Sequence, residues 1–197
     1  MKKLFIILLL MTNQTLSNDK PSDLQVAYLA GGCYWGLEEL IRKLPGVSNT
    51  YVGFTGGHVK NVSYKDVSRG DTGYAESIKI EFDSEALSFQ NLLLQFFKMH
   101  DPTTLNQQGP DRGTQYRSIA FYESSIEKEV IEKTIKELLS NKSYYKITTE
   151  VKKFKEFYLA EKYHQDYKKK NPYNPYILNV SAPRINKFKI DYSELLK

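Results

Sequence analysis

Residues 24–43 read LQVAYLAGGCYWGLEELIRK. The run Leu24–Ala30 is short and apolar, which is typical of a buried β-strand. The pair Gly31-Gly32 interrupts it, and Cys33–Lys43 then has the pattern of a helix. This segment predicts a strand, a tight turn and a helix, with Cys33 at the turn.

The rest of the chain mixes strand and helix patterns without a strict strand–helix–strand rhythm. Ser124 and Glu127 form a capping box, and residues 101–115 form a long polar loop. The predicted strands are Val47–Phe54, Tyr74–Phe82 and Tyr116–Tyr122, and the predicted helices are Ser88–His100, Ser124–Leu139 and a segment near Phe157–Lys169. We expect an α+β sandwich with a mixed sheet flanked by helices, long loops and an extended C-terminal tail.

Length and composition indicate one soluble domain of ordinary size. The chain has 197 residues, 41% of them hydrophobic and 26% charged. Its formal charge of +5 is spread along mixed-charge helical faces, so we expect no nucleic-acid binding. Tyrosine is abundant, with 15 copies, and some of these rings are expected to line a polar pocket.

The N-terminus has the pattern of an export signal. Met1-Lys2-Lys3 is basic, Leu4–Met11 is an unbroken apolar run, and Thr15-Leu16-Ser17 offers small residues for cleavage. We expect residues 1–17 to be a signal peptide and residues 18–197 a single catalytic domain, periplasmic or extracellular, with no stable membrane insertion after cleavage. An uncleaved anchor or a disordered start is the alternative.

Cys33 is the only cysteine of the chain, so it cannot form an internal disulfide. At a helix start, the unpaired N–H groups and the helix dipole favour the reactive thiolate. Gly32 permits close approach of backbone or substrate, and the rings of Tyr34 and Trp35 can wall an apolar slot. The alternative is an inert buried thiol with aromatic neighbours.

Glu76 is the leading candidate for a general acid. In the alternating strand Tyr74–Phe82, it shares one face with Ile78, Ile80 and Phe82. Burial of an acid on an apolar face raises its pKa toward the range of a proton donor. The alternative is a strand-end carboxylate in a salt bridge.

Other polar residues are weaker candidates when taken singly. Tyr64 lies in a loop, and Asp111 and Tyr116 belong to the polar stretch before a strand. The histidines lack metal-ligand spacing, so no metal site is predicted. His100 and His164 are expected to be hydrogen-bonded structural groups.

Taken together, the motifs resemble those of the A-type peptide methionine sulfoxide reductases over roughly residues 25–172. The motifs follow one another in the order Gly32-Cys33-Tyr34-Trp35-Gly36, Val52-Gly53-Phe54-Thr55-Gly56-Gly57, Ser63-Tyr64, Gly70-Asp71-Thr72-Gly73-Tyr74-Ala75-Glu76, His100-Asp101-Pro102, Asp111-Arg112-Gly113-Thr114-Gln115-Tyr116-Arg117-Ser118 and Tyr163-His164-Gln165-Asp166-Tyr167. Any one block is weak, whereas the ordered set is highly specific.

The resemblance implies a two-layer α/β sandwich that reduces the S epimer of methionine sulfoxide, free or in proteins. By position, Cys33 matches the family's nucleophile and Glu76 its acid. The remaining matches are Tyr64, Asp111 and Tyr116 for the polar groups, and Tyr34 and Trp35 for the methyl pocket. Two departures stand out: Tyr34 replaces the commoner Phe, and the tail lacks the resolving cysteine that many members carry.

Recycling then requires an external thiol, because attack by Cys33 on the sulfoxide leaves a sulfenic acid and no second cysteine exists. The resemblance implies a thioredoxin-like reductant, and no cofactor is expected. We expect a monomer whose tail beyond Asn171 leaves Cys33 accessible to the reductant.

Three other functions remain open on the residues alone. A thiol peroxidase would turn over peroxide and not methyl sulfoxides. A cysteine hydrolase would need a base beside the thiol, and a non-catalytic module that binds oxidised methionine would survive the loss of Cys33.

The predicted export signal has a direct test. N-terminal sequencing of protein from the native host should find that Met1–Ser17 is missing. An intact Met1 on cytosolic protein would refute the export prediction and leave the catalytic prediction untouched.

Overall fold

The computed structural model describes residues 24–196, so the predicted signal peptide lies outside the described residues. A six-stranded sheet has the order β7-β6-β1-β3-β2-β8, in which β6 and β7 are parallel and the other neighbours antiparallel. Its strands are β1 (Leu24–Gly31), β2 (Val47–Thr55), β3 (Ala75–Asp83), β6 (Ser118–Tyr122), β7 (Glu150–Lys153) and β8 (Phe157–Leu159). The mixed sheet of the sequence prediction is confirmed.

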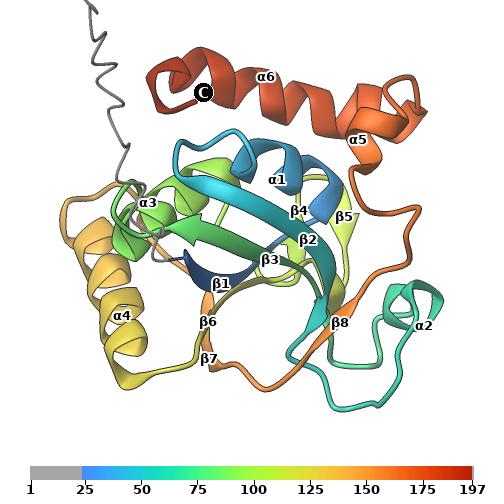
Figure 1. Ribbon diagram of the computed structural model, residues 1–197, viewed down its shortest axis with the longest axis horizontal. Coiled ribbons are helices and arrows are strands. Elements are labelled where there is room, and N and C mark those ends of the chain that lie inside the picture. The colour runs from blue at the N-terminus through green and yellow to red at the C-terminus, as the bar shows by residue number, and fades with distance from the viewer. Residues whose placement is uncertain (1–23, 197) are drawn as a thin grey trace, which may run out of the picture.

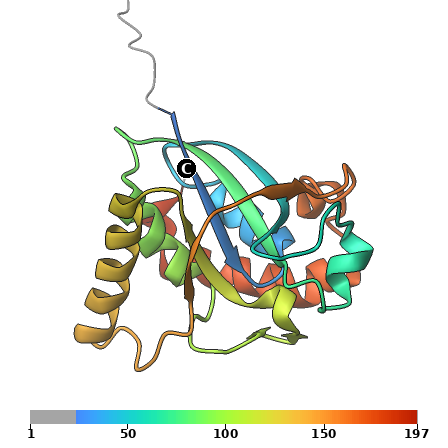
Figure 2. The same ribbon diagram turned by 90° about the horizontal axis from the view of Figure 1, so that it is seen from below.

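Helices pack on the sheet to give two layers. Figures 1 and 2 show α1 and α6 on the same side of the sheet, with α4 and α2 at its opposite ends. The helices are α1 (Tyr34–Ile41), α2 (Tyr64–Ser68), α3 (Phe89–Met99), α4 (Ser125–Ser140), α5 (Tyr167–Lys170) and α6 (Ala182–Asp191). No helix among residues 24–196 is long and apolar enough to cross a bilayer.

The β1–turn–α1 unit forms as predicted. Gly32 has φ +85°, a left-handed conformation that costs a glycine little, and it turns the chain out of the sheet. Cys33 occupies the N-cap position of α1 without a side-chain cap bond to the helix. The turn therefore places the sulfur at the end of the central part of the sheet, before the first helical residue.

Strand β3 confirms the predicted alternation. Ile78, Ile80 and Phe82 are at most 1% exposed and belong to the main core beneath the helices. Glu76, at 3% exposed, lies on the same side of the strand. The carboxyl group is thus carried into the layer between sheet and helices by its register alone.

Two predicted elements differ from the structure. The helix expected near Phe157–Lys169 is wrong, because residues 157–159 instead pair with β2 as strand β8 and only Tyr167–Lys170 is helical. The C-terminal segment is helical rather than extended. It contains a π-helical turn at Ile177–Ser181 and then α6, because Ile177, Ile185 and Phe188 bury their side chains at helical spacing.

The segment after β8 is held against the body by polar side chains. The Gln165 side-chain amide pairs with the backbone of β2 as a neighbouring strand would. Its Oε1 accepts from Val52 N at 2.9 Å, and its Nε2 donates to Val52 O at 2.8 Å. Asp166 adopts φ 57° and donates its N–H to the buried Glu38, while Arg42 pairs with both carboxylates. These bonds bring His164 and Tyr167 onto the N-terminal turn of α1.

The remaining short elements frame the same region. The predicted polar loop contains a two-stranded hairpin, β4 (Gln107–Gln108) and β5 (Asp111–Arg112), followed by a 3₁₀ turn at Thr114–Tyr116. Helix α2 begins at Tyr64 with a capping box formed by Ser63 and Asp66. Both predicted tyrosines of the site therefore lie at helical turns.

Candidate active site

The Cys33 thiol and the Glu76 carboxyl group meet at the N-terminus of α1. Cys33 is 6% exposed, and its side chain hydrogen-bonds with the Glu76 carboxyl group. The backbone N–H of Tyr34 donates to Glu76 Oε2 at 3.1 Å. The free N–H of the first helical residue thus binds the carboxyl group and holds it beside the sulfur.

Burial raises the pKa of Glu76 to about 8, and the neighbouring Asp111 raises it as well. The Tyr34 N–H and the Cys33 thiol oppose this rise because they hydrogen-bond to the ionised form, but they are the smaller effects. At neutral pH the carboxyl group therefore keeps its proton. The predicted burial of Glu76 is confirmed, and its role as a proton donor stays a prediction.

The surroundings of Cys33 act on its ionisation in opposite directions. Burial and the adjacent Glu76 raise the pKa of the thiol, and they outweigh the Tyr176 hydroxyl, the Trp35 backbone and Arg184, which favour the thiolate. In this closed arrangement, burial opposes the thiolate that the helix start favours, and the ionisation state of Cys33 stays a prediction. The helix terminus is present, but the sulfur is too deeply buried for its dipole to dominate.

The other predicted polar residues converge on the same place. Burial raises the pKa of the Tyr64 hydroxyl to about 12 and also raises the pKa of Tyr116. The nearby charges of Glu76 and Cys33 act on both hydroxyl groups in the same direction. Asp111 is close enough to influence Glu76. The structure brings together the acid, the nucleophile candidate and two protonated hydroxyl groups.

Trp35 forms an aromatic wall with residues from the segment after β8. Its ring stacks on Tyr167 with centroids 3.7 Å apart, and its Nε1 donates to His164 Nδ1 at 3.1 Å. His164 is therefore the hydrogen-bonded structural group that the sequence predicts, as is His100, which bonds to Phe96 O and Ser118 Oγ. Tyr34 is fully buried, and its hydroxyl lacks a hydrogen-bond partner among residues 24–196.

Comparison with known proteins agrees with this geometry. A model of the family "Peptide methionine sulfoxide reductase" matches residues 25–195. This chain belongs to that family. Within residues 24–196, no group of three or more His, Cys, Asp and Glu side chains could hold a metal ion.

The similarity extends to whole relatives. The peptide methionine sulfoxide reductase MsrA of Nautilia profundicola is 47% identical over 162 residues, which cover 82% of this chain and 92% of that protein. The MsrA of Saccharolobus solfataricus is 44% identical over 165 residues, covering 84% and 93%. The reduced form of Mxr1 from Saccharomyces cerevisiae superposes with a TM-score of 0.71 at 36% identity, covering 79% of this chain and 90% of that one.

In this reductase, a side chain of the protein itself fills the space next to Gly32. A Cβ at this position would lie 2.4 Å from Cγ of Gln108, so the glycine admits that side chain beneath the turn. Gly32 is therefore needed for the turn and for its packing against Gln108. The substrate-binding role expected of Gly32 stays a prediction.

The C-terminal segment of the reductase supplies two site residues that the sequence did not reveal. The Tyr176 hydroxyl donates to Asp111 Oδ2, and its ring meets Trp35 edge-on with centroids 5.6 Å apart. Arg184 Nη2 donates to the carbonyl oxygen of Cys33 at 3.2 Å. The abundance of tyrosine is a general signal for Tyr176, and no sequence pattern indicates Arg184.

This arrangement contradicts the expectation that the tail beyond Asn171 leaves Cys33 accessible. Tyr176 and Arg184 both bond to Cys33, and the sulfur is covered in consequence. The physical reason is the burial of Ile177, Ile185 and Phe188, which docks the segment over the helical layer. Access of a second thiol therefore requires this cover to move.

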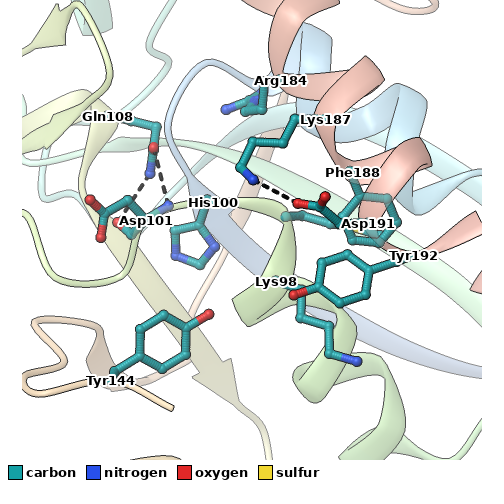
Figure 3. Close-up of a pocket in the computed structure, with 11 residues that line it drawn as sticks. Lys98, His100, Asp101, Gln108, Tyr144, Arg184, Lys187, Phe188, Asp191 and Tyr192 are labelled. Atoms are coloured by element: carbon teal, nitrogen blue, oxygen red, sulfur yellow. Dashed lines mark hydrogen bonds and ion pairs between the residues drawn. The ribbon is translucent and has the colours of Figure 1, made fainter.

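A cavity of about 350 Å³ lies beside the site, between α6 and the end of α3. Figure 3 shows Arg184, Lys187, Phe188 and Asp191 on one side of it, facing His100 and Gln108. Cys33 does not line this cavity. The open space thus lies between the C-terminal helix and the end of α3.

The buried acid gives a prediction for stability. Glu76 has a pKa near 8 in the folded reductase against 4.5 ordinarily, so the folded state holds a proton that the unfolded chain has released. The contribution of this proton to the free energy of unfolding is fully present below the ordinary pKa of 4.5 and is lost as pH rises through the folded-state pKa. The free energy of unfolding then falls by at most ~1.4 kcal/mol per pH unit.

Glu76→Gln does not titrate, so its free energy of unfolding should fall less steeply with pH over that range. Urea unfolding of both proteins at a series of pH values measures the difference. Parallel stability curves would contradict the raised pKa.

Proposed function

We propose that this reductase converts the S epimer of methionine sulfoxide, free or in proteins, to methionine by attack of Cys33 on the sulfoxide sulfur. The observation that carries the proposal is the contact of a buried thiol with a carboxyl group that stays protonated at neutral pH. A thiol alone is a poor partner for a sulfoxide, whose oxygen is a poor leaving group until it is protonated. The pair supplies a nucleophile and a proton donor at one point.

The substrate methyl group lies against the Trp35 ring, and its oxygen faces Glu76, Tyr64 and Tyr116. Glu76 donates its proton to the sulfoxide oxygen, which makes the sulfur electrophilic, and the two hydroxyl groups stabilise the same oxygen. The Cys33 sulfur then attacks the substrate sulfur and forms a sulfur–sulfur bond, which breaks as the hydroxyl group passes to Cys33 and the thioether leaves. The net exchange converts thiol and sulfoxide into sulfenic acid and thioether, so the oxygen passes from methionine to Cys33.

Two protons must be handled separately in this scheme. Both Cys33 and Glu76 are protonated in the closed site, because burial disfavours their charged forms. The Glu76 proton goes to the departing oxygen, and the Cys33 proton must leave before or during attack. The reaction therefore needs a proton acceptor for the thiol in addition to the proton donor Glu76.

An external thiol returns Cys33 to its starting state. Two thiol groups reduce the sulfenic acid to thiol, giving a disulfide and water, with a mixed disulfide as the intermediate. A thioredoxin-like protein is the proposed reductant. Mxr1, which resembles this chain, has also been solved in complex with Trx2, although that structure is 24% identical with a TM-score of 0.51 and supports only a shared fold.

We further propose that the protein works outside the cytoplasm as a monomer. Support for export comes from the basic start, the apolar run Leu4–Met11 and the small residues at Thr15-Leu16-Ser17. The substrates there are oxidised proteins or free methionine sulfoxide, and no cofactor or metal enters the scheme.

The role of Glu76 is testable in one turnover. Glu76→Gln keeps the shape and the hydrogen bond from Tyr34 but has no acidic proton, so methionine release should slow by roughly tenfold to a thousandfold. Rapid-quench measurement of methionine under single-turnover conditions is the assay, with Cys33→Ser as the inactive control. An unchanged rate would move the acid role to Tyr64 or Tyr116.

The single cysteine gives a stoichiometric prediction. Without reductant, the wild-type reductase should release about one methionine per molecule and stop at the sulfenic acid, because no second thiol exists to reduce it. A sulfenic-acid reagent and mass spectrometry identify the product on Cys33. Sustained turnover without any thiol, or a disulfide between two Cys33 residues as the main product, would refute this recycling scheme.

A further inference from the structure

Tyr176 links the sulfur of Cys33 to a carboxylate on the opposite side. Its hydroxyl donates to Asp111 Oδ2, on the short strand β5, and it also hydrogen-bonds with the Cys33 side chain. The edge-on contact with Trp35 holds the ring in this position. One phenol therefore bridges two groups that are 78 residues apart in the chain.

The direction of these bonds follows from the number of protons. A phenol has a single proton to donate, and an ionised carboxylate can only accept. While the Tyr176 proton goes to Asp111, the phenol oxygen is free to accept from the Cys33 thiol. Once the sulfur is a thiolate, the phenol donates to it instead, which is how Tyr176 favours the thiolate. The result is a continuous chain of hydrogen bonds that runs from Cys33 through Tyr176 to Asp111.

We propose that Tyr176 is a further catalytic residue of this reductase, which relays the thiol proton of Cys33 to Asp111 as the sulfur attacks. The inference rests on the function proposed above and supplies the acceptor that it requires. In one concerted shift, the thiol proton moves to the phenol oxygen while the phenol proton moves to Asp111. The products are a thiolate, an intact phenol and a protonated carboxyl group, so the charge passes from Asp111 to sulfur.

The two carboxyl groups are suited to opposite tasks. Glu76 is 3% exposed and keeps its proton, so it cannot serve at the same time as the acceptor. Asp111 is only partly buried, and Tyr176 and Arg184 counteract the rise in its pKa that burial causes. Asp111 is therefore the more readily ionised of the pair. One carboxyl group gives a proton to oxygen, and the other takes one from sulfur.

Groups from every surrounding element act on this chain of bonds. The titratable and charged side chains that interact with Cys33 or Tyr176 come from α1, α2, β3, β5, the 3₁₀ turn and α6, and they are Tyr34, Tyr64, Glu76, Asp111, Tyr116 and Arg184. Of these, Arg184 is the only cation, and it favours the thiolate. The pH dependence of the rate must therefore be expressed as the ratio of wild-type to variant rate, because both proteins share all the other titratable groups.

Tyr176→Phe tests the relay, because it keeps the ring against Trp35 and removes only the hydroxyl. The rate of the first turnover is measured by rapid quench with a methyl sulfoxide substrate from about pH 6 to about pH 9. We expect the ratio of wild-type to variant rate to be about ten at neutral pH and to shrink as pH rises, because hydroxide then removes the thiol proton. Tyr173→Phe is the matched control, since Tyr173 lies in the same segment but is 85% exposed, and it should match the wild type.

Asp111→Asn removes the other end of the same relay. It should reproduce the loss and its pH dependence, and the double variant with Tyr176→Phe should be no slower than the slower single variant. A Tyr176→Phe rate equal to wild type would overturn the relay and leave Tyr176 as a cover alone. Equal slowing at every pH would also overturn it, because that is the result of a structural defect. Failure of the underlying function would look different: Cys33→Ser would retain turnover.

Discussion

The hydrogen bond from the Tyr34 backbone N–H to the Glu76 carboxyl group joins the central strand of the sheet to the first turn of the first helix. An unpaired N–H at a helix start needs an acceptor, and a carboxyl group on a core-facing strand position needs a donor. Each satisfies the other. Because Cys33 immediately precedes that N–H, the same bond holds the sulfur next to the acid, and the surrounding tyrosines and the C-terminal cover are arranged about this pair.

Protonation in the site follows from dehydration more than from any single charge. Burial raises the pKa of both Cys33 and Glu76, and the helix start beside the thiol does not reverse this. A resting enzyme with a neutral thiol reacts slowly with stray electrophiles and oxidants, because the thiolate is the reactive form. Burial therefore protects a cysteine that has no neighbouring thiol to rescue it, and it requires that the proton leave only when substrate is in place.

Local sequence patterns are sufficient to predict the elements whose residues follow a strand or turn pattern. The alternation in β3 placed Glu76 on the core side, and the glycine pair before Cys33 marked the strand-to-helix turn. Long-range packing decided the rest. The segment 157–159 is a strand because β2 has a free edge there, and Arg184 reaches Cys33 across 151 residues of sequence, for which no local pattern exists. The depth at which Cys33 is buried has the same cause, since part of its cover comes from that distant segment.

The chain has a single tryptophan, and it stands beside the nucleophile. Trp35 stacks on Tyr167, donates to His164 and meets Tyr176 edge-on, so three of its contacts belong to the segments that surround the sulfur. Indole emission depends strongly on stacking, hydrogen bonding and exposure to water. The native protein therefore carries its own fluorescent label at a position where opening of the cover would break the edge-on contact with Tyr176 and change the exposure of the indole to water. Its fluorescence can be followed in time without chemical modification or competing signals from other tryptophans.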